Sequence, residues 1–203
     1  MKRVFTASLV PAVLVALGAP VRGQDVTEPK SGVAFAPKSG DMSLLGVGVR
    51  TKTMLKVKVY AVGLYVADSA LSGPLAAHKG KTDAPAVYKD LVWGDFEKQI
   101  VMKFTRGVSA DQIRGAFRET LTGADTSKLN LFLGYFSDTK EGEQYVLTWK
   151  PGGILETNVA GLGKLPIEDK NFAAAVFGIW LGEKPIQEDI KKGLVSRAPQ
   201  LIK

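Results

Sequence analysis

The chain has 203 residues, of which 45% are hydrophobic and 23% charged, a composition that is typical of a globular domain and excludes general disorder. It contains no cysteine, which excludes disulfides, thiolate nucleophiles and cysteine-ligated metals. The formal net charge is +7, and the one histidine is His78. A metal site of two histidines is therefore excluded, and any Ser-His-Asp triad would have to use that residue.

The amino terminus, residues 1–23, has the pattern of a signal peptide. Lys2 and Arg3 precede an uncharged stretch over residues 4–21, and Gly23 provides a small residue at a cleavage site. The apolar run is short for a membrane-spanning helix, and an uncleaved anchor is the alternative.

Cleavage would remove Lys2, Arg3 and Arg22 and no acid, so the net charge would fall from +7 to +4. The remaining lysines are scattered rather than gathered in a basic stripe, so we expect no nucleic-acid partner. The expected mature protein is a single domain of residues 24–203. It is expected to be periplasmic or secreted, with no membrane association after signal cleavage.

The first half of this domain predicts strands. After a polar lead-in with a short strand at 33–36, apolar strands are predicted at 44–50 and 55–67. In the longer one, Lys56 and Lys58 alternate with apolar residues before both faces become apolar, which is typical of a strand that enters a buried sheet. The short polar break between the two strands predicts an antiparallel hairpin.

The middle of the chain predicts a loop over 72–84, a short helix over 87–92 and a strand over 96–105. His78 falls in the polar loop, where we expect a solvated surface histidine.

Ser109 and Gln112 form a capping box, which predicts a helix that starts there and stops at Gly123. A second helix is expected around 127–136.

The last third combines a hairpin with helices. Strands at 145–149 and 154–159 flank Pro151-Gly152-Gly153, a strong turn sequence. Helices are expected over 168–181 and from 185 to 192. Hairpins with interspersed helices indicate an α+β fold with an antiparallel sheet.

Cofactor motifs are missing from the sequence. Gly46-Val47-Gly48 lacks the third glycine of a dinucleotide loop, and no phosphate-binding P-loop is present. No cofactor and no metal are expected, and no residue is assigned a catalytic role. Arg50 ends a glycine-rich apolar strand, and the residues alone leave open whether it is a surface residue or an anion hook in a cavity.

A resemblance to a known protein family bears on the role of Arg50. Four segments, which lie in a stretch of about 155 residues, resemble the chalcone isomerase family and its exported bacterial members: 46–50, 58–66, 104–120 and 172–185. The resemblance implies a chalcone isomerase-like fold, in which an antiparallel β-sheet is covered on one face by a layer of helices. Fold alone does not assign a function, because the family includes enzymes and non-catalytic fatty-acid-binding proteins.

The enzymes of this family share polar positions that this chain keeps only in part. Their arginine matches Arg50, but Tyr60 stands in place of their threonine, and Ile113, Ala116 and Thr120 stand where they have tyrosine, lysine and asparagine. The first two of these three side chains cannot donate or accept hydrogen bonds. The fatty-acid-binding relatives resemble this chain in pairing an arginine with a tyrosine, which suits a carboxylate.

Three functions therefore remain open. The first is a non-catalytic protein that holds a fatty acid or similar amphipathic carboxylate in an apolar pocket. The second is an isomerase of the chalcone isomerase type, or another enzyme, that acts through Arg50 on an unknown substrate. The third is a structural or partner-binding exported protein with a collapsed pocket. For the first function, the expected ligand-binding residues are Arg50, Tyr60, Ile113, Ala116, Phe117 and Thr120.

The geometry of this site can also be predicted. In an antiparallel hairpin with its turn within residues 53–56, opposed residues have a constant index sum of about 110, which pairs Arg50 with Tyr60 on one face. Lys58 and Val62 flank Tyr60 in alternation, so the pocket is expected to be polar at one end. Two apolar stripes are expected to form its wall or, alternatively, a solid core: Ile113, Ala116 and Phe117 on one helix, and Phe172, Val176 and Ile179 on another.

Overall fold

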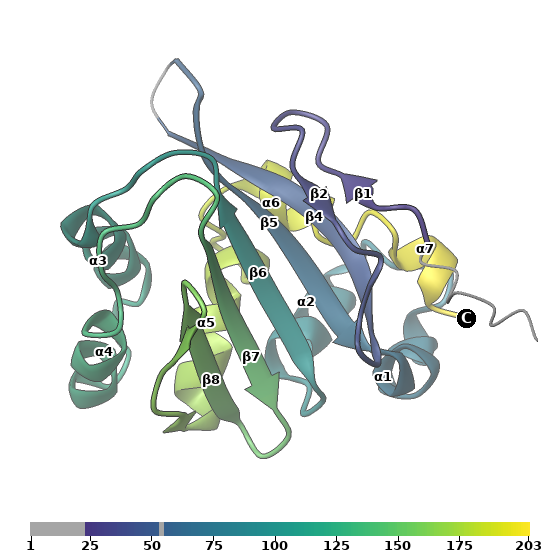
Figure 1. The fold of residues 1–203 in the computed structure, drawn as a ribbon. Helices are drawn as coiled ribbons and strands as arrows, with labels where there is room; N and C mark the ends of the chain where they lie inside the picture. Colours follow the sequence, from purple (N-terminus) through teal and green to yellow (C-terminus); the bar gives the residue numbers. More distant parts are fainter. Residues whose placement is uncertain (1–22, 53–54) are drawn as a thin grey trace, which may run out of the picture.

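An antiparallel sheet organises the protein, whose computed structural model describes residues 23–52 and 55–203 (Figure 1). Its strands lie in the order β10-β8-β7-β6-β5-β4-β3, and β9 pairs with β8. The strands are β3 (Lys38–Ser39), β4 (Met42–Lys52), β5 (Val57–Ala67), β6 (Lys98–Phe104), β7 (Gln144–Lys150), β8 (Ile154–Val159), β9 (Leu162–Gly163) and β10 (Ile167–Glu168). The predicted hairpins around 50–60 and 150–154 are confirmed.

Helices cover one face of this sheet and share a continuous hydrophobic core with it. They are α1 (Asp68–Ser72), a 3₁₀ helix η1 (Pro74–His78), α2 (Pro85–Trp93), α3 (Ala110–Thr120), α4 (Thr126–Leu133), α5 (Lys170–Leu181), α6 (Glu188–Gly193) and α7 (Ala198–Leu201). In Figure 1, α2, α5 and α6 lie behind the sheet, whereas α3 and α4 stand beside its left edge. The α+β class and the helical layer agree with the sequence prediction.

The opposite face of the sheet is covered in part by the amino-terminal segment. Strands β1 (Val26–Thr27) and β2 (Ala34–Phe35) pair with each other and lie in front of β4 in Figure 1. Phe35 is fully buried in a second, smaller core cluster on this face. The Nζ of Lys103 in β6 donates to the Ala34 carbonyl at 2.7 Å and ties the segment to the sheet.

The long β4–β5 hairpin has the predicted register. Arg50 pairs with Tyr60, and the pairs from Gly46 with Leu64 onward keep the same index sum. The register then shifts between the pairs of Arg50 and Thr51, which marks an irregularity of the β-bulge type. The expected turn falls on residues 53–56, of which 53 and 54 lie outside the described residues.

The predicted capping box at the start of a helix is confirmed, whereas the prediction of a loop over residues 72–84 is wrong in part. The Ser109 and Gln112 capping box is present at the start of α3. Within the expected loop, η1 forms, and His78 is not a solvated residue: its side chain is 13% exposed, and its Nε2 lies 2.6 Å from the Asp90 carboxylate. Asp90 belongs to α2 and lies 12 residues after His78 in the sequence, so the polar composition of the loop did not indicate this contact.

Lys98 of β6 is fully buried, which is unusual for a lysine. Its Nζ donates to the Gly94 carbonyl at 2.7 Å and lies 3.9 Å from the centroid of the Trp149 ring. Burial lowers the pKa of Lys98 from 10.5 to about 7, an effect that the Asp95 carboxylate only partly opposes.

This burial predicts a pH dependence of stability. The pKa of Lys98 is lower in the folded state, about 7, than in the unfolded state, about 10.5. Between these two pH values the unfolded state therefore binds more protons than the folded state. The free energy of unfolding must then rise as the pH increases from about 7 to about 10.5. Chemical denaturation of the wild type and of Lys98→Met should therefore differ in slope by up to about 1.4 kcal/mol per pH unit. If the free energy of unfolding had the same pH dependence in both proteins, the lowered pKa of Lys98 would be contradicted.

Candidate functional site

A cavity of about 600 Å³ lies between the β4–β5 hairpin, the segment that follows β6, helix α3 and the carboxyl end of α5. Its inner wall consists of buried, mostly aromatic or apolar side chains: Tyr60, Met102, Phe104, Ile113, Phe117, Ile179 and Trp180. Its outer rim carries exposed charged side chains: Lys52, Arg106, Asp111 and Glu119. The cavity thus runs from a polar opening to an apolar interior, and its volume falls in the range of small-molecule sites.

All six residues that were predicted from the sequence to bind a ligand line this cavity: Arg50, Tyr60, Ile113, Ala116, Phe117 and Thr120. Their contact with a ligand stays a prediction. The Thr120 hydroxyl donates within α3, to the Ala116 carbonyl at 3.0 Å, so in this conformation it can only accept a hydrogen bond from a ligand.

The second predicted stripe lines the cavity only at one end. Ile179 of α5 reaches it, but Phe172 and Val176 lie in the solid core. The ring of Phe172 packs 5.6 Å from that of Phe132 in α4. Helix α5 therefore contributes its carboxyl end to the site, and the wall is made mainly by α3 and the strands.

The Arg50 guanidinium has no carboxylate partner among the ion pairs of the described residues. Its Nη1 donates to the Thr51 carbonyl at 3.0 Å and to the Gln187 Oε1 at 3.3 Å. The guanidinium has five N–H donors, and two neutral acceptors on one nitrogen leave most of them and the whole positive charge uncompensated. A partly buried cation in this state favours an anion at the cavity wall.

Tyr60 presents a hydroxyl that is ready to donate. The Trp180 Nε1 donates to the Tyr60 oxygen at 3.1 Å, and the hydrogen bonds of the described residues give the phenolic proton no acceptor. Burial raises the pKa of Tyr60 to about 12, so the group is protonated at neutral pH. The tyrosine is thus oriented by the indole, and its proton remains available to a ligand.

Lys58 was predicted to make one end of the cavity polar, and this prediction is wrong. That residue does not line the cavity, whereas Val57 and Val59 do. The register shift beside Arg50 is the reason, because a one-residue slip exchanges the faces of a strand. Lys52 and Arg106 supply the basic rim instead.

Gln187 holds the site together and was not foreseen in the sequence. Its Oε1 accepts from the Thr51 backbone N–H at 3.1 Å and from Arg50, and its Nε2 donates to the Val49 carbonyl at 3.3 Å. It is the residue before α6, and no motif or spacing marks it. Trp180 lies within segment 172–185, which resembles the family, but nothing in the sequence links its indole to Tyr60.

Close packing of α6 on β4 places Gln187 over this strand. A Cβ added to Gly46 would lie 2.1 Å from the Gly193 carbonyl oxygen, and one added to Gly48 would lie 3.1 Å from the Cα of Ile190. The glycines of β4 therefore let the backbone of α6 approach closely. This approach brings the amide of Gln187 within hydrogen-bond distance of the strand end that carries Arg50.

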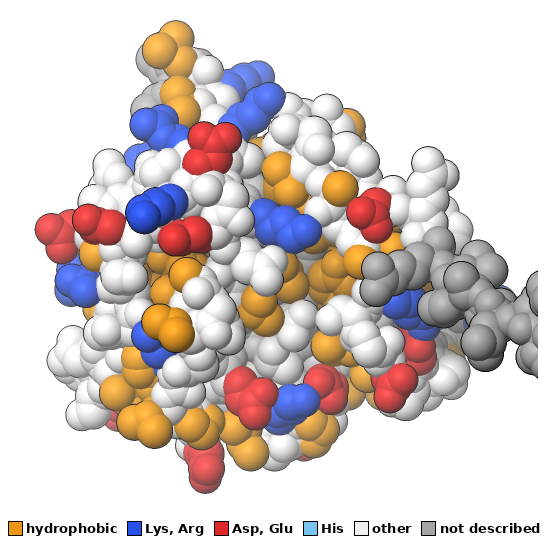
Figure 2. Space-filling model, in the orientation of Figure 1, with side chains coloured by type: hydrophobic (Ala, Val, Ile, Leu, Met, Phe, Trp, Pro, Cys, Tyr) orange, Lys and Arg blue, Asp and Glu red, His pale blue; other side chains and the backbone are white. Residues whose placement is uncertain are grey.

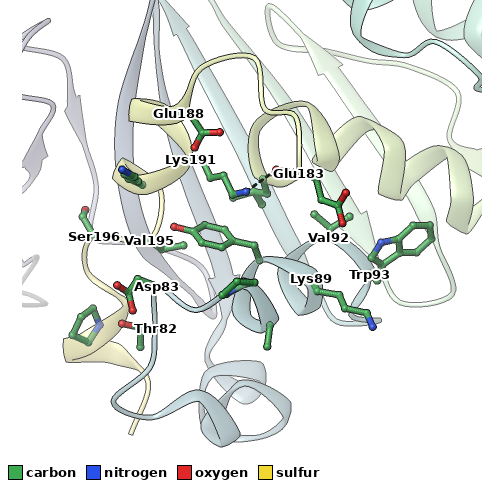
Figure 3. A pocket seen from close by; sticks show the side chains of 17 residues that line it. Thr82, Asp83, Lys89, Val92, Trp93, Glu183, Glu188, Lys191, Val195 and Ser196 are labelled. Atoms are coloured by element: carbon green, nitrogen blue, oxygen red, sulfur yellow. Dashed lines mark hydrogen bonds between the residues drawn. The ribbon is translucent and has the colours of Figure 1, made fainter.

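A second depression, of about 1080 Å³, lies between α2, the end of α5, α6 and residues 195–199 (Figure 3). Its charges are mixed, and the Lys191 ammonium already donates to the Gly182 carbonyl at 2.7 Å, 4.6 Å from the centre of the Tyr88 ring. Burial and the Asp83 and Glu188 carboxylates raise the pKa of Tyr88. This depression is larger, but its lining mixes lysines with the Asp83, Glu183 and Glu188 carboxylates. The cavity at Arg50 is the better candidate site, because there a cation without a carboxylate partner lies on the same wall as the buried Tyr60 hydroxyl.

Within residues 23–52 and 55–203, no three His, Asp or Glu side chains gather as a metal site would require. No helix in the same ranges has the length and apolarity to cross a membrane.

Comparisons with known proteins agree with this architecture. Residues 32–196 match the family model described as chalcone isomerase-like. Chalcone isomerase-like protein 1 of Humulus lupulus is 33% identical in an alignment of 177 positions that covers 77% of this chain and 82% of the relative. A chalcone–flavanone isomerase of Saussurea medusa is 29% identical over 75% of this chain and 76% of its own length.

Proteins named for fatty-acid binding are also similar. Fatty-acid-binding protein 2 of Arabidopsis thaliana is 24% identical over 87% of this chain, which spans 51% of that protein. The crystal structure of an Arabidopsis thaliana fatty-acid binding protein superposes with a TM-score of 0.75 at 21% identity, covering 88% of this chain and 99% of the other, and it shows the same fold. The chain belongs to the chalcone isomerase-like family.

Proposed function

We propose that the protein binds a fatty acid or a similar amphipathic carboxylate, and that it does not catalyse ring closure. The observation that carries this proposal is the uncompensated Arg50 guanidinium beside the Tyr60 hydroxyl at the wall of an apolar cavity. The guanidinium meets one or both carboxylate oxygens, and the hydroxyl donates a further hydrogen bond. The acyl chain lies against Met102, Phe117 and their apolar neighbours.

Names of relatives support the ligand class without deciding it, because both fatty-acid-binding proteins and isomerases are similar to this chain. The lining of α3 favours binding over catalysis. Ring closure develops charge that a polar network must stabilise, and removal of a single donor from such a network typically costs a factor of about 100–1000 in rate. Ile113 and Ala116 line the cavity and offer no side-chain donor.

Two assays on one preparation test the proposal. Titration calorimetry with palmitate should show saturable binding, and an absorbance assay with a chalcone should show no ring closure above the uncatalysed rate. Turnover that depends on Arg50 would assign the cavity to an isomerase instead. A protein that neither binds palmitate nor turns over a chalcone would favour a structural role.

Tyr60→Phe should weaken palmitate binding by about 0.5–1.5 kcal/mol, which is the net contribution of one hydrogen bond. The substitution keeps the ring and its packing against Phe104 at 5.8 Å between centroids, but it leaves the buried Trp180 Nε1–H without its acceptor, so the free energy of unfolding should fall by about 1–3 kcal/mol. Calorimetry of the variant with palmitate measures the effect. Unchanged affinity would show that the hydroxyl does not touch the carboxylate.

We also propose that residues 1–23 are an export signal and that the protein acts in the periplasm or outside the cell. The support is the basic start, the uncharged stretch and the small residue at Gly23. The intact mass of the exported protein should correspond to a chain that begins at Gln24. Full-length protein in the membrane fraction would contradict cleavage and favour the anchor.

A further inference from the structure

The tip of the β4–β5 hairpin combines an exposed apolar side chain with unpaired cations. Leu55 is 87% exposed, the highest value among the large apolar side chains that the structure describes as exposed. Lys52, Lys56 and Lys58 are exposed beside it, and none of them takes part in an ion pair of the described residues. From Arg50 to Val59 the sequence contains no acid. In Figure 1 the hairpin extends beyond the rest of the sheet.

This tip adjoins the opening of the cavity. Lys52 belongs both to the hairpin and to the rim, and Arg106 from the segment after β6 adds another exposed cation to the rim. Figure 2 shows basic side chains close to an apolar tip at the top of the molecule, where Figure 1 places the hairpin. The acids of the rim, Asp111 and Glu119, come from α3 on the other side of the opening, so positive charge is concentrated on the hairpin side.

We propose that the hairpin tip docks onto an anionic lipid bilayer, with Leu55 inserted among the headgroups and the lysines and Arg106 against lipid phosphates. Charge complementarity carries the choice of partner. Basic residues near an anionic membrane add binding energy individually, and an apolar side chain at the centre of the basic group inserts into the interface. Docking in this orientation brings the mouth of the cavity to the bilayer surface, where an amphipathic carboxylate is dissolved.

The proposal replaces the expectation from the sequence that the mature domain has no membrane association. Folding brings Arg106 to the three lysines of the hairpin, so four cations lie around one end of the molecule. The inference goes beyond the proposed function, because vesicle binding requires no ligand in the cavity.

Co-sedimentation with vesicles tests the docking surface. The purified protein, without added ligand, is mixed with vesicles of phosphatidylcholine alone or of phosphatidylcholine with phosphatidylglycerol. It should bind the anionic vesicles, release them at high salt and bind the neutral ones weakly. Lys56→Gln/Lys58→Gln should lower the affinity for anionic vesicles about 25-fold, or about fivefold for each lysine. Leu55→Ser should lower it about tenfold.

The matched control is Lys79→Gln/Lys81→Gln. It removes two exposed lysines that lie between η1 and α2, away from the hairpin tip in the sequence. This control should bind as the wild type does, and all variants share the same amino terminus. Equal binding to neutral and anionic vesicles, or equal losses in the control and the hairpin variant, would overturn the proposal. Equally tight binding to a short single-stranded DNA, weakened by the same hairpin substitutions, would reassign the surface to polyanions and would also overturn it. Because the vesicle experiments contain no added ligand, their outcome does not decide whether the protein binds palmitate in solution.

Discussion

Replacing Arg50 with alanine is expected to weaken palmitate binding by about 3 kcal/mol, or about 100-fold, because the ligand loses its charged, fork-shaped partner. The guanidinium is held at the cavity wall by the Thr51 carbonyl and Gln187 Oε1, so its donors are already oriented before the ligand arrives. Arg50→Lys should recover only part of the affinity, since an ammonium keeps the charge but not the planar pair of donors. Titration calorimetry on the three proteins measures both effects.

Two controls separate the anion site from general damage to the cavity. Hexadecanol has the apolar chain without the carboxylate, and its affinity should change little in Arg50→Ala. Lys52→Ala removes a charge from the rim, and it should weaken palmitate binding much less than the loss of Arg50. If Arg50→Ala weakened the alcohol and the acid equally, the residue would be structural and the carboxylate would bind elsewhere.

Gly46→Ala is expected to lower the free energy of unfolding by about 3 kcal/mol. The added Cβ would lie 2.1 Å from the Gly193 carbonyl oxygen and 2.6 Å from the Leu194 carbonyl carbon, and both are backbone atoms that cannot rotate away. The strand and α6 must therefore move apart, which also separates Gln187 from Arg50. Urea denaturation measures the loss of stability, and calorimetry should show weaker palmitate binding in the same variant.

Gly178→Ala is the matched control within α5. A Cβ there meets no atom within 4 Å, and alanine has the higher helix propensity, so this variant should be more stable by up to about 1 kcal/mol. A Gly46→Ala variant as stable as the wild type would show that the contact between β4 and α6 is looser than described.

Local patterns predicted those parts of the fold that depend on neighbouring residues. The capping box at Ser109 and the index sum that pairs Arg50 with Tyr60 are set by short-range hydrogen bonding and hairpin geometry, and both are present. The bulge beside Arg50 was not predictable from alternation, and it removed Lys58 from the cavity. The partner of His78 was missed for a related reason, since Asp90 comes close only when η1 packs against α2.

The candidate site depended on the family resemblance for its residues and on the fold for its chemistry. The resemblance selected Arg50 and Tyr60, and the structure places both along one cavity. It could not indicate that Trp180 orients the tyrosine or that Gln187 braces the arginine, because both contacts span more than 100 residues. Of the predicted stripe on α5 only Ile179 lines the cavity, because apolar spacing alone does not distinguish a lining residue from a core residue.

Mass spectrometry of an organic extract of the natively purified protein shows whether the cavity holds a carboxylate at Arg50, and it requires no prior choice of ligand. We expect a long-chain carboxylic acid in near-stoichiometric amount in the wild type, and its loss from an equally folded Arg50→Ala variant purified in parallel. An extract with no acidic lipid, or with the same amount of it from both proteins, would contradict the claim that Arg50 holds a carboxylate ligand in this cavity.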